Sequence, residues 1–387
     1  MRQVCSIFSQ ILQLFSRTQF EQAVVEHKAE RHARGFPSWT QFVAMLFCQL
    51  GRAHSLSEIT QGLAASEGKL KHLGVLKPPA KSTLAYANQH RPWELYPTVF
   101  SHLLQHCQSL ADERQSKFRF KNPLVSLDAT TIDLCLELYD WAHFRRSKGA
   151  VKLHLLLDHD GYLPRFAVVT EGKTHEIRVA RQLHFEPGTI IAMDRGYNDY
   201  DWFETLTRQG VWFVTRMKEN TNYVVTEDRP LPANAKVLSD QVIAWVAQAR
   251  QEKELFFRRV VVRDEKNQKD LVFLTNNLRL AASTIGAIYK DRWQIELFFK
   301  SLKQLCKIKT FVGTSANAVK IQIWTALIAM LLLRFLQLKA KFNWALSNLL
   351  ALLRQQVFVH RPLWDWLDEP FQPPPPLEDE QMRLNWA

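Results

Sequence analysis

Cysteine is scarce in this sequence, and long apolar runs are missing. The five cysteines are scattered with no CxxC pair, so neither a disulfide framework nor a zinc site is indicated. The strongest membrane candidate, Ile323–Leu333, ends at Arg334 and is too short to span a bilayer, so we expect a buried helix there. No secretion signal is expected at the start of the chain. These absences predict a cytoplasmic protein with no membrane partner.

The charge balance is clearly basic. The 387 residues carry 50 Lys and Arg against 38 Asp and Glu, a net charge of +12, while hydrophobic residues make up 47%. This composition is that of a folded globular protein and excludes wholesale disorder and collagen. Residues 1–122 alone hold 15 basic and 8 acidic residues, a difference of +7. A polyanionic partner is therefore expected, with much of the positive charge near the N-terminus.

Residues 1–120 show helical periodicity. Short helices are predicted over Leu56–Leu63 and Lys81–Arg91, the second opened by Ser82 as N-cap. Polar side chains of the second helix suit phosphates and base edges, and its candidate DNA contacts are Lys81, Asn88 and Arg91. The pattern favours an all-helical N-terminal DNA-binding domain of the helix-turn-helix kind. A helical packing domain with a solvated polar face is the alternative.

From about residue 123 the pattern changes to strands alternating with helices. Three β-rich runs come first, then a helix, a strand, a helix and a strand; these are Leu124–Asp128, Val151–Leu157, Leu163–Val169, His175–Leu183, Thr189–Met193, Trp202–Arg208 and Val211–Thr215. The order βββαβαβ predicts an α/β fold, with a mixed sheet covered by flanking helices, of the ribonuclease H-like kind.

The rest of the chain divides into three parts. Residues 218–278 contain further strands and one predicted helix, Val242–Ala249, and are interpreted as an inserted β subdomain. Helix is expected over Ala281–Leu305 and again over Val319–Leu353. The predicted catalytic domain thus combines 121–217 with 279–355, and 356–387, with its proline run, is expected to be a C-terminal tail that packs little.

Three carboxylates are candidates for chemistry. Asp128 and Asp194 each follow an apolar strand, so both are expected at one edge of the sheet, where hard cations such as Mg²⁺ or Mn²⁺ find oxygen ligands. Glu296 is the third candidate, on the predicted helix Tyr289–Lys303. One face of that helix collects polar residues, namely Tyr289, Arg292, Glu296, Lys300 and Lys303. The alternative is an amphipathic surface helix with an Arg292–Glu296 pair.

Asp194-Arg-Gly-Tyr197, together with Tyr289-x2-Arg292-x3-Glu296-x6-Lys303, resembles the signature of bacterial insertion-sequence transposases of the DDE type, in the group numbered four. The segment Leu127–Thr131 is similar to the first acidic motif of that family. The resemblance implies cut-and-paste transposition, with two divalent ions held by Asp128, Asp194 and Glu296 and a hairpin intermediate on the transposon end. It also implies that Tyr289, Arg292 and Lys303 grip DNA phosphates.

Several further contacts and partners are predicted. Lys300 shares the face of Glu296, and Arg216 and Lys218 follow a strand end, so we expect all three to contact DNA. Trp293 is expected to pack in the core, with stacking on an unpaired base as the alternative, and Trp245 is expected to be buried. The expected partners are double-stranded DNA, as terminal inverted repeats and as target, and a second copy in a synaptic homodimer on the bacterial nucleoid. A DNA-binding regulator without chemistry, or a nuclease without strand joining, remains open.

Overall fold

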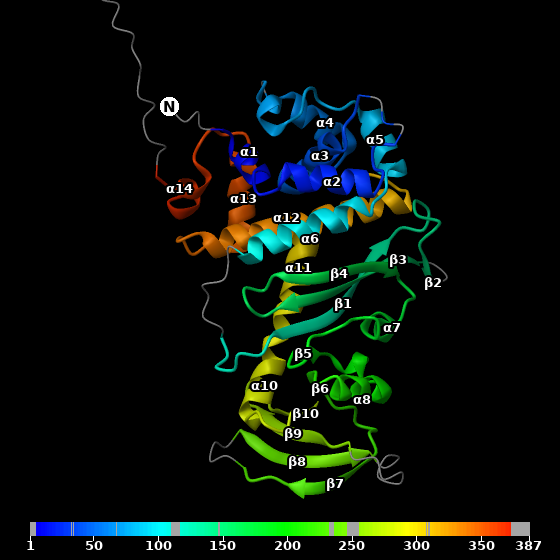
Figure 1. Cartoon of the computed structure of the whole chain (residues 1–387), viewed down its shortest axis with the longest axis vertical. Coiled ribbons are helices and arrows are strands. Elements are labelled where there is room, and N and C mark those ends of the chain that lie inside the picture. Colours follow the sequence, from blue (N-terminus) through cyan, green and yellow to red (C-terminus); the bar gives the residue numbers. More distant parts are fainter. Residues whose placement is uncertain are drawn as a thin grey trace, which may run out of the picture.

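The computed structural model describes residues 5–372 except positions 32, 34, 67, 110–116, 146–147, 232–235, 246–254, 307 and 309. A long mixed sheet occupies the middle and lower part of the molecule, with helices on both faces, and a group of helices covers one end (Figure 1). This arrangement confirms the predicted α/β class with a large mixed sheet and flanking helices.

The helical end is built from two distant stretches of the chain. Its helices are α1 (Ile7–Leu12), α2 (Arg17–Glu26), α3 (Ser38–Leu50), α4 (Leu56–Ala64), the 3₁₀ helix η1 (Lys69–Leu73), α5 (Lys81–His90), α6 (Leu95–Ser109), α12 (Ala316–Lys339), α13 (Leu346–Gln356) and α14 (Leu363–Asp368). Serine side chains cap α1, α2, α4 and α12 by accepting a backbone N–H. The predicted cap Ser82 lies inside α5 instead, because that helix begins at Lys81 after Ala80.

Helix α12 runs through the middle of this helical end. By length and composition alone it is long and apolar enough to cross a membrane, but 89% of its most apolar window is buried. Helices α3, α5, α6 and α13 pack around it, and its buried side chains belong to the largest core cluster. The prediction of a buried helix at Ile323–Leu333 is therefore confirmed, and the helix is longer than that apolar run.

Ten strands form the sheet in the order β2-β3-β1-β5-β6-β10-β9-β8-β7, with β4 paired to β3. Their bounds are β1 (Leu124–Leu134), β2 (His143–Arg145), β3 (Lys148–Asp158), β4 (Pro164–Glu171), β5 (Ile190–Met193), β6 (Trp212–Arg216), β7 (Tyr223–Asp228), β8 (Val237–Trp245), β9 (Phe257–Asp264) and β10 (Lys269–Thr275). The pairs β1–β5 and β5–β6 are parallel. With α7 (Glu176–Ala180) and α8 (Tyr200–Arg208) between strands, the predicted order of elements is present, and the short β2 is added to it.

The two faces of the sheet carry different helices. Alternate residues of a strand point to opposite faces: Leu127 and Met193 pack with Phe203 of α8, whereas Leu124 packs with Ile288 of α10 (Ala282–Asp291). Helix α11 (Trp293–Leu305) follows α10 directly. The predicted helix over Ala281–Leu305 is thus two helices.

Strands β7 to β10 extend this same sheet, because β10 pairs antiparallel with β6. The helix predicted over Val242–Ala249 is wrong in its first part, where β8 pairs with β7 and β9 up to Trp245; residues 246–249 lie outside the described residues. A short apolar run does not distinguish strand from helix by periodicity. The helical stretch predicted over Val319–Leu353 is also divided, into α12 and α13.

The region after residue 356 was predicted to pack little, and its first part contradicts this. Leu363, Trp366 and Leu367 of α14 are buried in the main core cluster, and His360 forms an isolated β-bridge with Ser6. These apolar residues close the helical end against α1. The proline run that begins at residue 373 lies outside the described residues.

Candidate active site

Asp128 and Asp194 stand next to each other on neighbouring parallel strands. The last pair in the register of β1 with β5 is Leu127 opposite Met193, and each acid is the next residue. Because neighbouring strands lie about 4.8 Å apart, both carboxylates emerge where β5 ends. Strand β1 itself continues to Leu134 along β3, which corrects the prediction that Asp128 ends its strand.

Asp194 is fixed by the turn that follows β5. Its Oδ1 accepts the backbone N–H of Gly196 at 2.5 Å, and its carbonyl oxygen accepts the Thr215 hydroxyl at 3.1 Å. A Cβ atom at residue 196 would lie 2.8 Å from Asp194 Oδ1. Any side chain at residue 196 would therefore force the Asp194 carboxylate to shift.

Glu296 reaches the two aspartates from the first turns of α11 through Arg292. The guanidinium of Arg292 donates to Glu296 Oε1 at 2.5 Å and to Asp128 Oδ2 at 3.4 Å. Arg292 occupies the junction of α10 and α11 and is 7% exposed. The structure thus brings all three predicted carboxylates to one place, with a buried cation joining two of them.

The electrostatics of Asp128 reflect this crowding. Burial is the main cause that raises the pKa of Asp128 to about 6, and the charges of Asp194 and Glu296 raise it further, against the Ala129 N–H and Arg292. Two neighbouring carboxylates therefore act on the third, as expected when acids share a site. The ionised form of Asp128 is therefore disfavoured by its surroundings.

The chemistry of the cluster suits a hard cation, although its present geometry is that of an ion pair. In the described part of the chain, no group of three or more His, Cys, Asp or Glu side chains is arranged to hold a metal ion. The Arg292 guanidinium instead pairs with both Asp128 and Glu296. The donors are all carboxylate oxygens, which Mg²⁺ and Mn²⁺ prefer. The raised pKa of Asp128 is the observation that fits a further positive charge here.

The other residues of the predicted helix face lie around this cluster. The Tyr289 ring packs against Phe273, with the Arg292 guanidinium 5.3 Å from its centroid. Lys303 donates to the Thr131 carbonyl of β1 at 2.7 Å, which ties α11 to the sheet. Lys300 is exposed. Only Lys300 of these three presents its charge mainly to solvent.

Basic residues also lie beside Asp194. Arg216 is the last residue of β6, and Lys218 donates to the Asn198 carbonyl at 3.4 Å. Lys218 and Arg195 line an open hollow next to Asp194, together with Gly196, Glu219 and Asn220. Since the hollow adjoins the carboxylates, an anionic strand entering it would meet both cations before reaching Asp194.

The helix predicted to read DNA presents fewer polar groups than expected. Asn88 is 2% exposed, and its Oδ1 accepts from Gln41 at 2.9 Å. Arg91 is half-buried and donates to Gln41 Oε1 at 3.2 Å and to the Phe36 carbonyl. The burial of Asn88 contradicts its predicted DNA contact, whereas the contact predicted for half-buried Arg91 stays a prediction. Lys81 is exposed.

The two tryptophans behave differently from each other. Trp245 is 5% exposed, as predicted, but Trp293 is 56% exposed, against the expectation of core packing. Trp293 is the first residue of α11, and its ring lies at the surface. The apolar face of α11 is instead supplied by Ile295, Phe299 and Leu302, which are all buried.

Two features near the site have no counterpart in the predictions. Tyr197, the last residue of the Asp-Arg-Gly-Tyr motif, is 2% exposed, and burial followed by the charges of Asp128, Glu176 and Asp194 raises the pKa of its hydroxyl. The motif was the only sequence signal for it. The second feature is a buried contact between His159 and Asp291, which no spacing in the sequence indicated.

The large mixed sheet sets Asp128 beside Asp194 where β5 ends, and Arg292 links Asp128 to Glu296 of α11. The sequence profile of the transposase DDE domain matches residues 119–332, which is more than half of the chain. The chain therefore belongs to the transposase DDE domain family, whose members generally use divalent metal ions. A domain family of unknown function (DUF4372) matches residues 3–76.

Individual relatives agree with this assignment. A Sinorhizobium fredii protein named as a transposase is 29% identical over 310 residues, which cover 79% of this chain and 83% of the relative. A Geobacillus stearothermophilus protein named as an insertion-sequence transposase is 28% identical over 289 residues, 74% of either chain. A solved piggyBac transposase synaptic complex with hairpin DNA matches 96% of this chain and 81% of that chain, at 9% identity and a TM-score of 0.42, below the level that shows a shared fold. The chain resembles bacterial insertion-sequence transposases.

Proposed function

We propose that this protein is a cut-and-paste DNA transposase of the family-four type, and that Asp128, Asp194 and Glu296 are its catalytic carboxylates. The single observation that carries the proposal is the register of β1 with β5, which sets Asp128 beside Asp194, with Arg292 linking Asp128 to Glu296 of α11. The reaction would be hydrolysis at the element ends, a hairpin intermediate, and joining of the freed 3′-hydroxyl to target DNA.

The three carboxylates would hold two divalent cations, Mg²⁺ or Mn²⁺. When bound, such ions activate a water or 3′-hydroxyl and neutralise charge on the phosphate. The protein's own part is to hold acids and cations close together. Arg292, which donates to Asp128 and Glu296, would be the cation available to a phosphate at this cluster. Its planar guanidinium suits bidentate phosphate contacts.

The DNA would approach over the edge of the sheet. Arg216, Lys218 and Arg195 lie beside Asp194, and exposed Lys300 lies on α11. These side chains offer phosphate contacts on two sides of the carboxylates. Tyr289 of α10 and Lys303 of α11 would hold their helices on the sheet as well as contact the DNA strand, since Tyr289 packs against Phe273 of β10 and Lys303 donates to Thr131 of β1.

Exposed Trp293 would provide a stacking surface for an extruded base. Its exposure at the first residue of α11, the helix that carries Glu296, supports this role. The sheet would be of the ribonuclease H-like kind. The order βββαβαβ over residues 124–216 supports this part of the proposal.

The N-terminal helices would bind the transposon ends. Of the predicted contacts at α5, Lys81 is exposed and Arg91 is half-buried, and further exposed polar residues of this helix include Thr83, Gln89 and His90. The proposed organisation is a DNA-binding domain over 1–120, a catalytic domain over 121–217 and 279–355, an insertion over 218–278 and a C-terminal part over 356–387. Two copies would pair two ends on the bacterial nucleoid in the cytoplasm.

The test is an end-cleavage assay on duplex DNA that carries the flanking inverted repeats, run with Mg²⁺ and with a chelator. Metal-dependent nicking that Asp128→Asn abolishes is expected. Joining of the 3′ ends to a target plasmid separates a transposase from a nuclease that does not join strands. Specific binding without cleavage would favour the DNA-binding regulator, and unchanged cleavage by Asp128→Asn would reject the site.

A further inference from the structure

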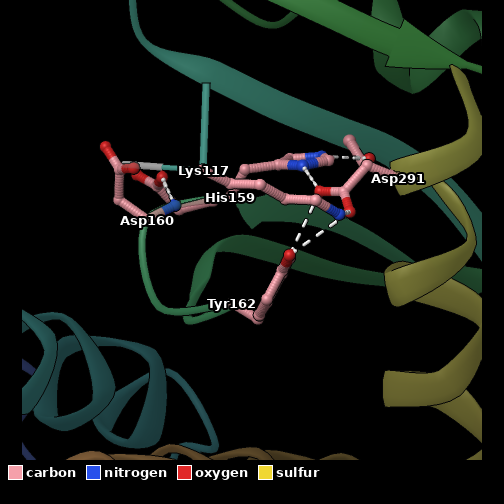
Figure 2. A network of polar contacts seen from close by, with 7 residues as sticks. Lys117, His159, Asp160, Tyr162 and Asp291 are labelled. Atoms are coloured by element: carbon pink, nitrogen blue, oxygen red, sulfur yellow. Dashed lines mark hydrogen bonds and ion pairs between the residues drawn. The ribbon is translucent and has the colours of Figure 1, made fainter. Parts of the chain in front are cut away.

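The junction between α10 and α11 is tied to the sheet through one buried carboxylate. Asp291 ends α10 and is 3% exposed. His159 Nδ1 lies 2.5 Å from its Oδ2, and the Tyr162 hydroxyl donates to both oxygens at 3.2 and 3.3 Å. Lys117 donates to Oδ1. Figure 2 shows His159, Tyr162 and Lys117 converging on this carboxylate.

Asp291 is ionised in this setting. Burial would raise its pKa, but the hydrogen bonds from His159 and Lys117 outweigh burial and lower the pKa. An ionised carboxylate only accepts hydrogen bonds, so His159 carries its proton on Nδ1 toward Asp291. The network therefore joins a fixed negative charge at the end of α10 to the turn between β3 and β4.

The other side of the imidazole reaches β1. His159 Nε2 lies 2.7 Å from the Ser126 hydroxyl, and the His159 backbone N–H donates to the Leu124 carbonyl at 3.0 Å. Ser126 lies two residues before Asp128 and therefore on the same face of the strand. One histidine thus connects the strand that carries Asp128 with the residue that precedes Arg292.

The turn itself is held in an uncommon conformation. Tyr162 has a φ of 55°, in the left-handed region that bulky residues rarely adopt. Its hydroxyl contacts with Asp291 compensate for this conformation and keep the ring near His159, with centroids 5.9 Å apart. The hairpin is therefore built to present two donors to one carboxylate.

The hydrogen-bonded chain from Ser126 through His159 to Asp291 has the residue types of a nucleophilic triad. The burial of these side chains excludes nucleophilic catalysis. Ser126 is 0% exposed and His159 is 6% exposed, so a substrate does not reach the hydroxyl. The hydrogen bonds of His159 and Asp291 instead hold β1 and the α10–α11 junction together.

We propose that His159 and Asp291 are positioning residues for the carboxylate cluster: together they fix the α10–α11 junction against β1, and so set Arg292 and Glu296 opposite Asp128. This inference rests on the proposed function of the cluster as a divalent-cation site. Residues that orient metal ligands typically change metal affinity about 10–100-fold when they are removed.

The test is a titration of the full chain with Mn²⁺. The electron paramagnetic resonance signal of the free ion measures how much Mn²⁺ is bound. His159→Ala is expected to weaken Mn²⁺ binding about 10–100-fold. His159→Asn is expected to restore most of the affinity, since its amide N–H takes the place of Nδ1 toward Asp291. Tyr162→Phe removes one hydroxyl only and is expected to weaken Mn²⁺ binding less than His159→Ala does. It is the test variant if His159→Ala does not fold.

The matched control is His154→Ala. His154 is equally buried on β3, at 1% exposure, but bonds to Thr170 away from Asp291. It is expected to lose stability and to keep wild-type Mn²⁺ affinity. The inference is overturned if folded His159→Ala or Tyr162→Phe binds Mn²⁺ as tightly as the wild type. It is also overturned if His154→Ala loses as much Mn²⁺ affinity as His159→Ala.

Asp128→Asn tests the cation site separately from the positioning role of His159 and Asp291. If the wild type binds no Mn²⁺, or if Asp128→Asn binds it as tightly, the cation site fails and the positioning role fails with it. If binding depends on Asp128 but not on His159, only the positioning role is overturned.

Discussion

The carboxylates of Asp128 and Glu296 share a single guanidinium, that of Arg292, at 3.4 Å and 2.5 Å. Two acids from distant parts of the chain are thus held together by a buried cation. Like charges at this spacing repel strongly in a poorly solvated site, so Arg292 allows the cluster to exist before any divalent ion arrives. The same contact means that ligand binding here has to exchange one positive partner for another.

Replacing Arg292 is therefore expected to affect both folding and chemistry. Arg292→Ala should slow strand cleavage about 10²–10³-fold, as loss of one charge-stabilising group at a reacting centre commonly does. Arg292→Lys should restore little, because a lysine does not bridge two acceptors in one plane. Cleavage rates at saturating Mg²⁺ check this, with exposed Lys266→Ala, in the turn between β9 and β10, as the comparison. Cleavage by Arg292→Ala at the wild-type rate would contradict the role.

Gly196→Ala should damage the site without unfolding the protein. The new Cβ would lie 2.8 Å from Asp194 Oδ1, so the carboxylate must move. A displacement of about 1 Å at a reacting group can cost about 10²-fold in rate. Cleavage kinetics and urea unfolding of the same preparation measure the two effects. Gly286→Ala in α10 is the comparison, since a Cβ there meets Val262 at an ordinary 3.4 Å, and it is expected to spare cleavage. Full activity of Gly196→Ala would show that Asp194 tolerates the shift.

A buried ion pair fixes the outer strands to the start of α10. Arg258 and Asp240 are 2% and 5% exposed and bond at 2.7 and 2.6 Å, and Arg258 also donates to the Leu280 carbonyl at 2.5 Å. Arg258→Met should lower the free energy of unfolding by about 3–5 kcal/mol, because Asp240 is left charged and buried.

The exposed pair Arg263 and Asp270, at 2.8 Å, is the matched control for that measurement. Breaking it with Arg263→Met should cost less than about 1 kcal/mol. The double variant Arg258→Met with Asp240→Leu should recover much of the lost stability in urea unfolding. Equal costs at the two pairs would contradict the importance of burial.

Stability should also depend on pH through His154. Burial, and then the charge of Lys152, lower the pKa of His154 to about 4, against about 6.5 in an unfolded chain. The unfolded state therefore takes up a proton first as pH falls. The stability linked to neutral His154 is complete above about pH 6.5 and is lost toward about pH 4, a change of about 3 kcal/mol.

His154→Gln removes this titration and should flatten the pH dependence of urea unfolding in that window. Exposed His184→Gln is the control and should follow the wild type. An unchanged slope in His154→Gln would show that other groups govern acid destabilisation.

Much of the central sheet was predictable because strands of this kind carry a local signal. Apolar alternation marked β1, β3 and β4, and short buried runs marked β5 and β6, so Asp128 and Asp194 were expected at one edge of the sheet. Periodicity failed where two outcomes share one pattern: the apolar run at Val242 became a strand because β7 and β9 flank it. Asn88 was assigned to DNA because polarity alone does not reveal that Gln41 lies opposite it.

The sequence by itself determined the class of fold, the three acids and the basic balance, since these depend on local periodicity and residue type. Only the tertiary structure decided that Arg292 joins Asp128 to Glu296, that Trp293 lies at the surface and that His159 meets Asp291. The physical reason is that those contacts join residues more than a hundred positions apart or depend on which helix face is covered. Such choices are made by packing among distant segments, and no local pattern encodes them.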